Sequence, residues 1–294
     1  MCPFSTVLAL AASLPLLFAG IAAPQQQKGA AAKGAQWLGN PPHALVRRVV
    51  SLAPSLTDEV IALGKTDLLV GVTRYDKQAE VAHLPRVGGF VDPSPEAVLA
   101  LQPDLVLWVT DGGALPGVKH IASLGVPVLA IPIITVSDVV ASARLVGAAL
   151  GDAPAGERLA RSLSLSIGMA RERAARGPPV RVLFIVGREP LVVAGPGSYP
   201  DELIRLAGGR NVAKSDRPWP VYPLENAVAD NPDLVIDGAV LEPPEGLERL
   251  AAIPAVKRGN VHRLLDDSAL RPGPRLAHAL DELTRALHPQ GRER

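Results

Sequence analysis

Few residues in this sequence have the types and spacing that catalysis requires. The six histidines show neither HxxxH nor HExxH spacing, so no pair is placed on one helix face to bind zinc. The segment LGKT at 63–66 resembles the end of a phosphate-binding loop, but Glu59 stands where that loop needs its first glycine. The segment GPGSYP at 195–200 matches neither GxGxxG nor GxSxG. We therefore expect no catalytic residues and no protein-bound metal.

Two glutamates occupy matching positions in a repeated segment. The segment PEAVLALQPDLVLW begins at Pro95, and its weaker echo PLENAVADNPDLVID begins at Pro223. In each copy a glutamate, Glu96 or Glu225, stands seven residues before a Pro-Asp pair. Both follow a proline at the start of a predicted helix, where the helix dipole stabilises a carboxylate. A structural role at the helix start is consistent with this placement.

Aromatic side chains are scarce, and three of them fall in loops. Tyr75 follows the apolar run LLVGVT, while Phe90 and Trp219 lie in the Gly- or Pro-rich segments VGGFVDP and RPWPVYP. Trp108 and Phe184 instead lie inside strand patterns, as core aromatics usually do. Packing within the loops is one interpretation, and contact with a ligand is the other. Together the three loop aromatics favour a binding site for a large flat ligand.

Composition limits the classes of function. The 294 residues, of which 48% are hydrophobic, are enough to bury a sizeable core and to form two domains. A net charge of +1 without a block of basic residues gives no reason to expect nucleic-acid binding. The only cysteine, Cys2, lies in the first segment of the chain, so disulfides and cysteine chemistry are not expected.

The N-terminal segment differs from the rest. Residues 7–23 carry no charge, end in small residues and precede the polar segment QQQKG, which predicts a secretory signal peptide over residues 1–23. An uncleaved membrane anchor is the alternative, although seventeen residues are short for a membrane span. Residues 24–46 are rich in Gln, Ala, Gly and Pro without periodicity and predict a flexible tether.

Short apolar runs alternate with amphipathic helical patterns on both sides of one long helical segment. This alternation predicts an α/β lobe over residues 47–150 and a second one over residues 178–294, each with a parallel sheet. Between them, residues 151–177 predict a bridging helix with Pro154 near its start and Gly177 at its end. Ligands bind beyond the carboxyl ends of parallel strands, so two facing lobes predict a cleft between them.

These segments together resemble the periplasmic substrate-binding proteins of ABC importers for cobalamin, haem and iron siderophores. The resemblance runs from about residue 47 to residue 288 and rests on RVVSLAPSLTDEVIALG, LLVGVTRYD, LPRVGGFVDPSPEAVLALQPDLVL, GGRNVA, the PLEN and NPDLVI repeat, and LRPGPR. It implies an α/β fold of two Rossmann-like lobes with parallel-type sheets, joined by a single long α-helix, with the ligand cleft between the lobes. A periplasmic protein, which we expect to be a monomer, would then deliver its ligand to an ABC importer permease.

Within this family, the sequence is most similar to the cobalamin-binding member. That similarity implies that Tyr75, Phe90 and Trp219 contact the corrin ring of the ligand. It further implies polar ligand contacts from Asp267 and Arg271. These two residues are also four positions apart, so a structural ion pair is the other interpretation.

The family resemblance also gives the paired glutamates a role. It implies that Glu96 and Glu225, one on each lobe, meet arginine pockets on the permease dimer. The expected ligand, cobalamin or a related corrinoid, is then cargo that leaves unchanged, and no cofactor is expected.

Three alternatives remain open at the level of sequence. A haem-binding member of the family would require an axial ligand, for which Tyr75 and His83 are candidates. A siderophore-binding member would use guanidinium groups against an anionic chelate, and the candidates are Arg74, Arg188, Arg217 and Arg271. An exported α/β enzyme or accessory protein that reuses the fold belongs to a different class.

Overall fold

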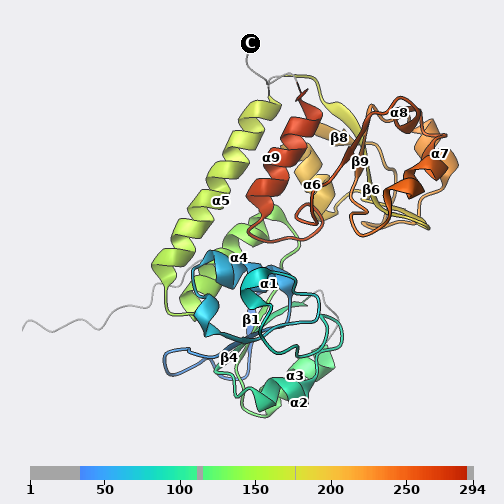
Figure 1. The fold of residues 1–294 in the computed structure, drawn as a ribbon. Coiled ribbons are helices and arrows are strands. Elements are labelled where there is room, and N and C mark those ends of the chain that lie inside the picture. Colours follow the sequence, from blue (N-terminus) through green and yellow to red (C-terminus); the bar gives the residue numbers. More distant parts are fainter. Residues whose placement is uncertain (1–33, 111–114, 176, 290–294) are drawn as a thin grey trace, which may run out of the picture.

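The computed structural model describes residues 34–110, 115–175 and 177–289, and their elements form two lobes (Figure 1). The first lobe has a five-stranded sheet in the order β1-β5-β4-β2-β3, in which only the edge strand β1 is antiparallel to its neighbour. The central strand β4 reads LVLWV and is buried at every position, as expected for a parallel strand covered on both faces. The strands of this lobe are β1 (Gln36–Leu38), β2 (Val49–Ser51), β3 (Leu69–Gly71), β4 (Leu105–Val109) and β5 (Val128–Ile131). Its helices are α1 (Pro54–Ala62), η1 (Thr66–Leu68), η2 (Ala79–Val81), α2 (Pro95–Ala100), α3 (Leu115–Ser123) and α4 (Val136–Ala149).

The second lobe repeats this design with a smaller set of helices. Its strands follow the order β10-β9-β6-β7, with β8 also paired to β6, and only β7 is antiparallel to its neighbour. The strands are β6 (Val180–Arg188), β7 (Leu191–Val193), β8 (Gly209–Asn211), β9 (Leu234–Asp237) and β10 (Val261–Arg263). The helices are α6 (Tyr199–Leu206), α7 (Leu224–Ala229), η4 (Pro244–Leu250), α8 (Pro254–Lys257) and α9 (Leu276–Leu287).

The long helix α5 (Ala153–Ala174) connects the lobes and lies beside α9 (Figure 1). Compared with the predicted range 151–177, it starts two residues later, after the Asp152 side chain accepts a hydrogen bond from the Ala155 amide at 3.0 Å. The preceding helix α4 crosses α5 closely at two glycines, because a Cβ on Gly147 would lie 2.6 Å from the Cα of Gly156. A continuous cluster of buried apolar side chains runs through α4, α5, α6 and α9, so the two lobes share part of their core.

The repeated segments form the same unit in both lobes, namely a short helix, α2 or α7, followed by a strand, β4 or β9. The residues before the two Pro-Asp pairs, Gln102 and Asn231, have φ values of 46° and 41°. A residue before proline is disfavoured in the right-handed helical region, and the left-handed conformation ends both helices at the same point.

The aspartates of the two Pro-Asp pairs also have equivalent partners. The Asp104 carboxylate accepts a hydrogen bond from the backbone amide of Arg48, directly before β2, at 2.9 Å. The Asp233 carboxylate accepts one from the backbone amide of Arg181, near the start of β6, at 3.0 Å. The Pro-Asp part of the repeat therefore secures a neighbouring strand in each lobe, and this structural role explains its presence in both copies.

The predicted tether over residues 24–46 requires a correction. Within that range, Gln36–Leu38 form strand β1, which pairs antiparallel with β5. Trp37 and Leu38 pack against the buried cores on the two faces of the sheet, which offsets the entropy of ordering this short segment. The missed signal was the apolar pair Trp-Leu. The predicted signal peptide, residues 1–23, lies outside the described residues.

The two aromatics predicted to be core residues are buried. Trp108 in β4 and Phe184 in β6 are among the largest fully enclosed side chains of the structure. In the described ranges, no helix combines the length and the apolar character needed to cross a membrane.

Candidate functional site

A cavity of about 390 Å³ opens where the two lobes meet. Most of its wall comes from the first lobe, from residues at or after the carboxyl ends of β2, β3, β4 and β5. This edge of a parallel sheet is where α/β proteins bind ligands. The second lobe contributes the segment 271–272. The lining residues are Ala53, Pro54, Ser55, Tyr75, Phe90, Val91, Val109, Ile133, Arg271 and Pro272.

Two of the predicted aromatics, Tyr75 and Phe90, share this cavity. The Tyr75 side chain is 46% exposed, so its ring is available to a ligand, whereas Phe90 packs partly against the core. The Arg74 guanidinium lies 5.2 Å from the centre of the Tyr75 ring, within the range of a cation–π contact. The same guanidinium donates to the Asp92 carboxylate at 2.6 Å, which ties the loop that carries Phe90 to the loop that carries Tyr75.

A glycine is required where the Phe90 loop turns. Gly88 has a φ of 103°, and a Cβ there would lie 2.6 Å from the backbone oxygen of Asp92. The VGG sequence before Phe90 therefore permits the tight turn that directs this loop towards the cavity. His83, the other candidate for a haem ligand, is exposed and does not line the cavity.

The structure does not place Trp219 in the cavity wall. Its loop lies against the second sheet, where Val221 bridges to Val192 in β7 and the Gly195 amide donates to the Pro218 carbonyl at 2.9 Å. The Trp219 side chain is nevertheless 45% exposed. An exposed tryptophan at the end of a loop is available to a ligand that extends beyond the cavity.

The polar pair predicted from the sequence, Asp267 and Arg271, is formed as an ion pair. Arg271 lines the cavity, whereas Asp267 is not among the lining residues. The Asp267 carboxylate also accepts a hydrogen bond from Arg275 at 2.6 Å. Arg275 in turn contacts Asp58 of α1 at 3.2 Å, so this polar cluster connects the second lobe to the first. Asp58 and Arg275 were not predicted as site residues, because 217 positions separate them in the sequence.

Glu96 and Glu225 both lie at the solvent-exposed starts of their helices. Their helices, α2 and α7, lie in different lobes, at a distance from α5 (Figure 1). Hydrogen bonds from the Glu96 backbone amide and from the Ser94 hydroxyl hold the pKa of Glu96 below its usual value. Both carboxylates are therefore presented to solvent on separate parts of the surface.

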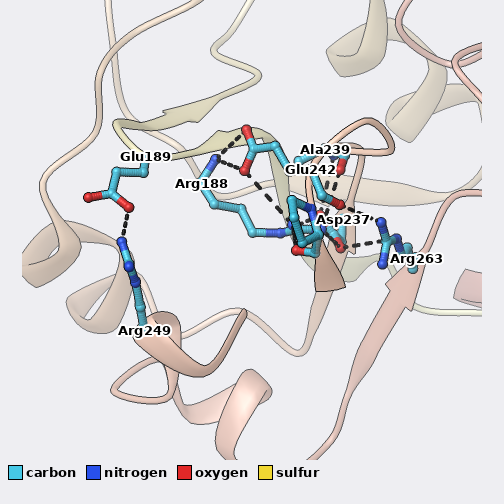
Figure 2. A network of polar contacts seen from close by, with 8 residues as sticks. Arg188, Glu189, Asp237, Ala239, Glu242, Arg249 and Arg263 are labelled. Carbon is cyan, nitrogen blue, oxygen red and sulfur yellow. Dashed lines mark hydrogen bonds and ion pairs between the residues drawn. The ribbon is translucent and has the colours of Figure 1, made fainter. Parts of the chain in front are cut away.

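A second polar network, within the second lobe, centres on Arg188 at the end of β6 (Figure 2). Its guanidinium donates to the Asp237 carboxylate at 2.6 and 3.2 Å and to the Pro243 carbonyl at 2.6 Å. The Glu242 carboxylate accepts from the backbone amide of Arg188, and the Arg263 guanidinium donates to the Glu242 carbonyl at 2.7 Å. Arg188 was a candidate for contacting an anionic ligand, but the structure buries it as an internal ion pair.

Comparison with known proteins gives consistent results. The chain matches the periplasmic binding protein family over residues 49–267. A vitamin B12-binding protein of Vibrio parahaemolyticus is 25% identical over 253 residues, which are 85% of this chain and 92% of that protein.

Solved structures of periplasmic binding proteins are also similar to this chain. The periplasmic haem-binding protein RhuT from Roseiflexus sp. RS-1, in its apo form, has a TM-score of 0.76 and 30% identity, covering 83% of this chain and 98% of that one. The periplasmic vitamin B12-binding protein BtuF of Vibrio cholerae has a TM-score of 0.74 at 24% identity, covering 85% and 99% of the two chains, and is similar in fold.

The fold and the family match lead to the same conclusion. Two parallel-type sheets, a long connecting helix and a cavity at the junction of the lobes are present, and the match covers the greater part of the chain. The chain belongs to the periplasmic binding protein family.

Proposed function

We propose that this protein is a periplasmic solute-binding protein that captures cobalamin or a related corrinoid and delivers it to the permease of an ABC importer. The observation that carries the proposal is the cavity between the lobes, which combines the aromatic rings of Tyr75 and Phe90 with the guanidinium of Arg271. Apolar walls with a few polar groups are typical of small-molecule binding sites. The named vitamin B12-binding relative supports this choice of ligand.

Binding in such a site relies on apolar burial and stacking. A ring system inserted against Tyr75 and Phe90 removes apolar surface from water, and Arg271 donates hydrogen bonds to acceptors at the edge of the ligand. No covalent step is involved, and the ligand leaves as it arrived. The shared core of α4, α5, α6 and α9 restrains the lobes, so we infer that capture occurs with little hinge motion.

Haem is the second candidate for the ligand. The similarity to a solved haem-binding protein at 30% identity supports it, and Tyr75 at the cavity wall offers a phenol oxygen as an axial ligand. Corrinoid and haem binding predict different responses at this one residue. Tyr75→Phe keeps the ring and removes the oxygen, so it spares stacking and removes an axial bond.

The first prediction concerns Tyr75. We expect Tyr75→Ala to weaken cyanocobalamin binding by about 1–3 kcal/mol, because the ring is lost, whereas Tyr75→Phe retains most of the affinity. Calorimetric titration of the chain starting at Pro24 measures both values, with haemin titrated in parallel. Leu165→Ala, an exposed residue of α5 outside the cavity, is the control and leaves affinity unchanged. Failure of cyanocobalamin to bind the unmodified protein overturns the corrinoid assignment.

The second prediction concerns delivery. We propose that Glu96 and Glu225 dock the two lobes on the permease, so Ala at both positions should lower transport at least about tenfold while ligand affinity stays the same. Uptake of labelled cyanocobalamin and calorimetric titration measure the two quantities separately. Glu172→Ala, which removes an exposed carboxylate from α5, is the matched control. A loss of ligand affinity in the double variant would show that the docking assignment is wrong.

A further inference from the structure

The charged groups of the cavity are already paired within the protein. Arg271 is the charged residue among those that line the cavity, and its guanidinium is held by the Asp267 carboxylate. The neighbouring Arg275 contacts Asp267 at 2.6 Å and both Asp266 and Asp58 at 3.2 Å. Both guanidinium groups of this cluster are therefore already bound to carboxylates of the protein.

Two other arginines that an anionic ligand would use are paired as well. Arg74, beside Tyr75, donates to both oxygens of Asp92 at 2.6 Å. Arg188 is enclosed with Asp237, so its charge does not reach the cleft. Arg217 is exposed in the Trp219 loop, and among the described residues it has no carboxylate within ion-pair distance, but it does not line the cavity.

This arrangement makes the binding of a negatively charged ligand unfavourable. A ligand carboxylate that reaches Arg271 must displace Asp267 or lie beside it, and two carboxylates in one partly buried site repel each other. A neutral amide meets no such repulsion. Its carbonyl accepts from the N–H groups of Arg271 that Asp267 leaves available, because a guanidinium carries five N–H donors.

We propose that the cleft selects a ligand whose edge carries uncharged amides or hydroxyls and rejects one whose edge carries carboxylates. The inference rests on the proposed function and states the chemical class of the ligand. It separates an amide-bearing corrinoid from haem, which has two carboxylates, and from anionic siderophores. Asp267 is the residue that sets this preference, because its carboxylate occupies the guanidinium that an anion would need.

The test compares ligands that differ at one peripheral group, which is an uncharged amide in one and a carboxylate in the other. Cyanocobalamin and its monocarboxylic acids, in which one peripheral amide is replaced by a carboxylate, are titrated into the protein at neutral pH by calorimetry. We expect the amide form to bind at least tenfold more tightly. In Asp267→Asn the carboxylate forms should gain at least tenfold while cyanocobalamin changes less. Asp281→Asn, which removes a half-buried carboxylate of α9 that is likewise paired with an arginine, is the matched control and leaves both affinities unchanged.

A second ligand pair keeps this inference separate from the corrinoid assignment. Haemin and its dimethyl ester differ in the same way, and tighter binding of the ester supports the charge preference even if no corrinoid binds. Equal or tighter binding of a carboxylate form, in either pair, overturns the inference. The proposed role as a solute-binding protein of an importer then still holds, with that ligand as its cargo. A protein that binds none of the four ligands overturns both the inference and the proposed function.

Discussion

Arg188→Met is expected to lower the free energy of unfolding by about 3–5 kcal/mol, because it leaves the Asp237 carboxylate buried without a partner. The Arg188 side chain is 2% exposed and that of Asp237 is fully enclosed. The guanidinium satisfies the carboxylate with two hydrogen bonds and also holds the Pro243 carbonyl at 2.6 Å. Chemical denaturation at neutral pH measures the loss.

An exposed ion pair near the Arg188 network serves as the control for this experiment (Figure 2). Arg249 and Glu189 form an ion pair whose side chains are 69% and 75% exposed. Water and salt screen such a pair, so Arg249→Met should change stability by less than about 1 kcal/mol. Combining Arg188→Met with Asp237→Leu removes both charges and should recover part of the loss. A loss below about 1 kcal/mol in Arg188→Met would show that the buried pair is not a stabilising element of the second lobe.

Glu59→Gln is expected to stabilise the protein by about 3 kcal/mol at pH 7, with little effect at pH 4. Glu59 lies in α1, is buried against α4, and its carboxyl is 2.9 Å from the Ser142 hydroxyl. Burial raises the pKa of Glu59 to about 8 from an ordinary value of 4.5, although the hydrogen bond to Ser142 acts in the opposite direction. Glutamine keeps the shape and the polar contact, and it needs no proton to remain neutral.

The sign of this effect follows from proton binding. Between pH 4.5 and about 8 the folded protein keeps the Glu59 proton while the unfolded chain has lost it. The folded state therefore binds one more proton, and this residue lowers stability by about 1.4 kcal/mol for each unit that the pH rises. Above pH 8 both states are ionised and the loss is complete.

Thermal and chemical unfolding of both proteins at several pH values check this prediction. The difference in stability between Glu59→Gln and the parent protein should grow from pH 5 to pH 8 and then become constant. The exposed α5 variant Glu172→Gln should show no such dependence. A constant difference over the whole range would mean that Glu59 is ionised in the folded protein.

Part of the site was predictable because it follows directly from the strands. Tyr75 and Phe90 come from loops on the cleft side of the first sheet, and the structure places both in the cavity together with Arg271. Local apolar runs predicted the strands, and parallel strands bring their carboxyl ends to one edge. Val109 and Ile133, at or just after the ends of β4 and β5, line the same cavity and could have been found by the same rule.

Other parts of the site were not predictable from local pattern. Trp219 has the loop position of a ligand contact, yet its loop lies against β7, outside the cavity wall. Whether each arginine is buried or exposed was also not predictable, since Arg188 is enclosed while Arg217 is exposed. Pairing of a charged side chain depends on which distant carboxylate the fold brings within reach, and sequence spacing carries no such information.

The sequence alone determined the α/β class and the repeated helix-strand unit, because periodicity and turn residues act over a few positions. The family followed from the resemblance of the sequence motifs to those of periplasmic binding proteins. The tertiary structure alone decided which carboxylates pair with Arg271 and Arg275 and how deeply Glu59 is buried. The contact between Asp58 and Arg275 joins residues 217 positions apart, and the Glu59 pKa depends on the helix packed over it. Electrostatic properties of this protein arise from distances and burial, and those exist only once the chain has folded.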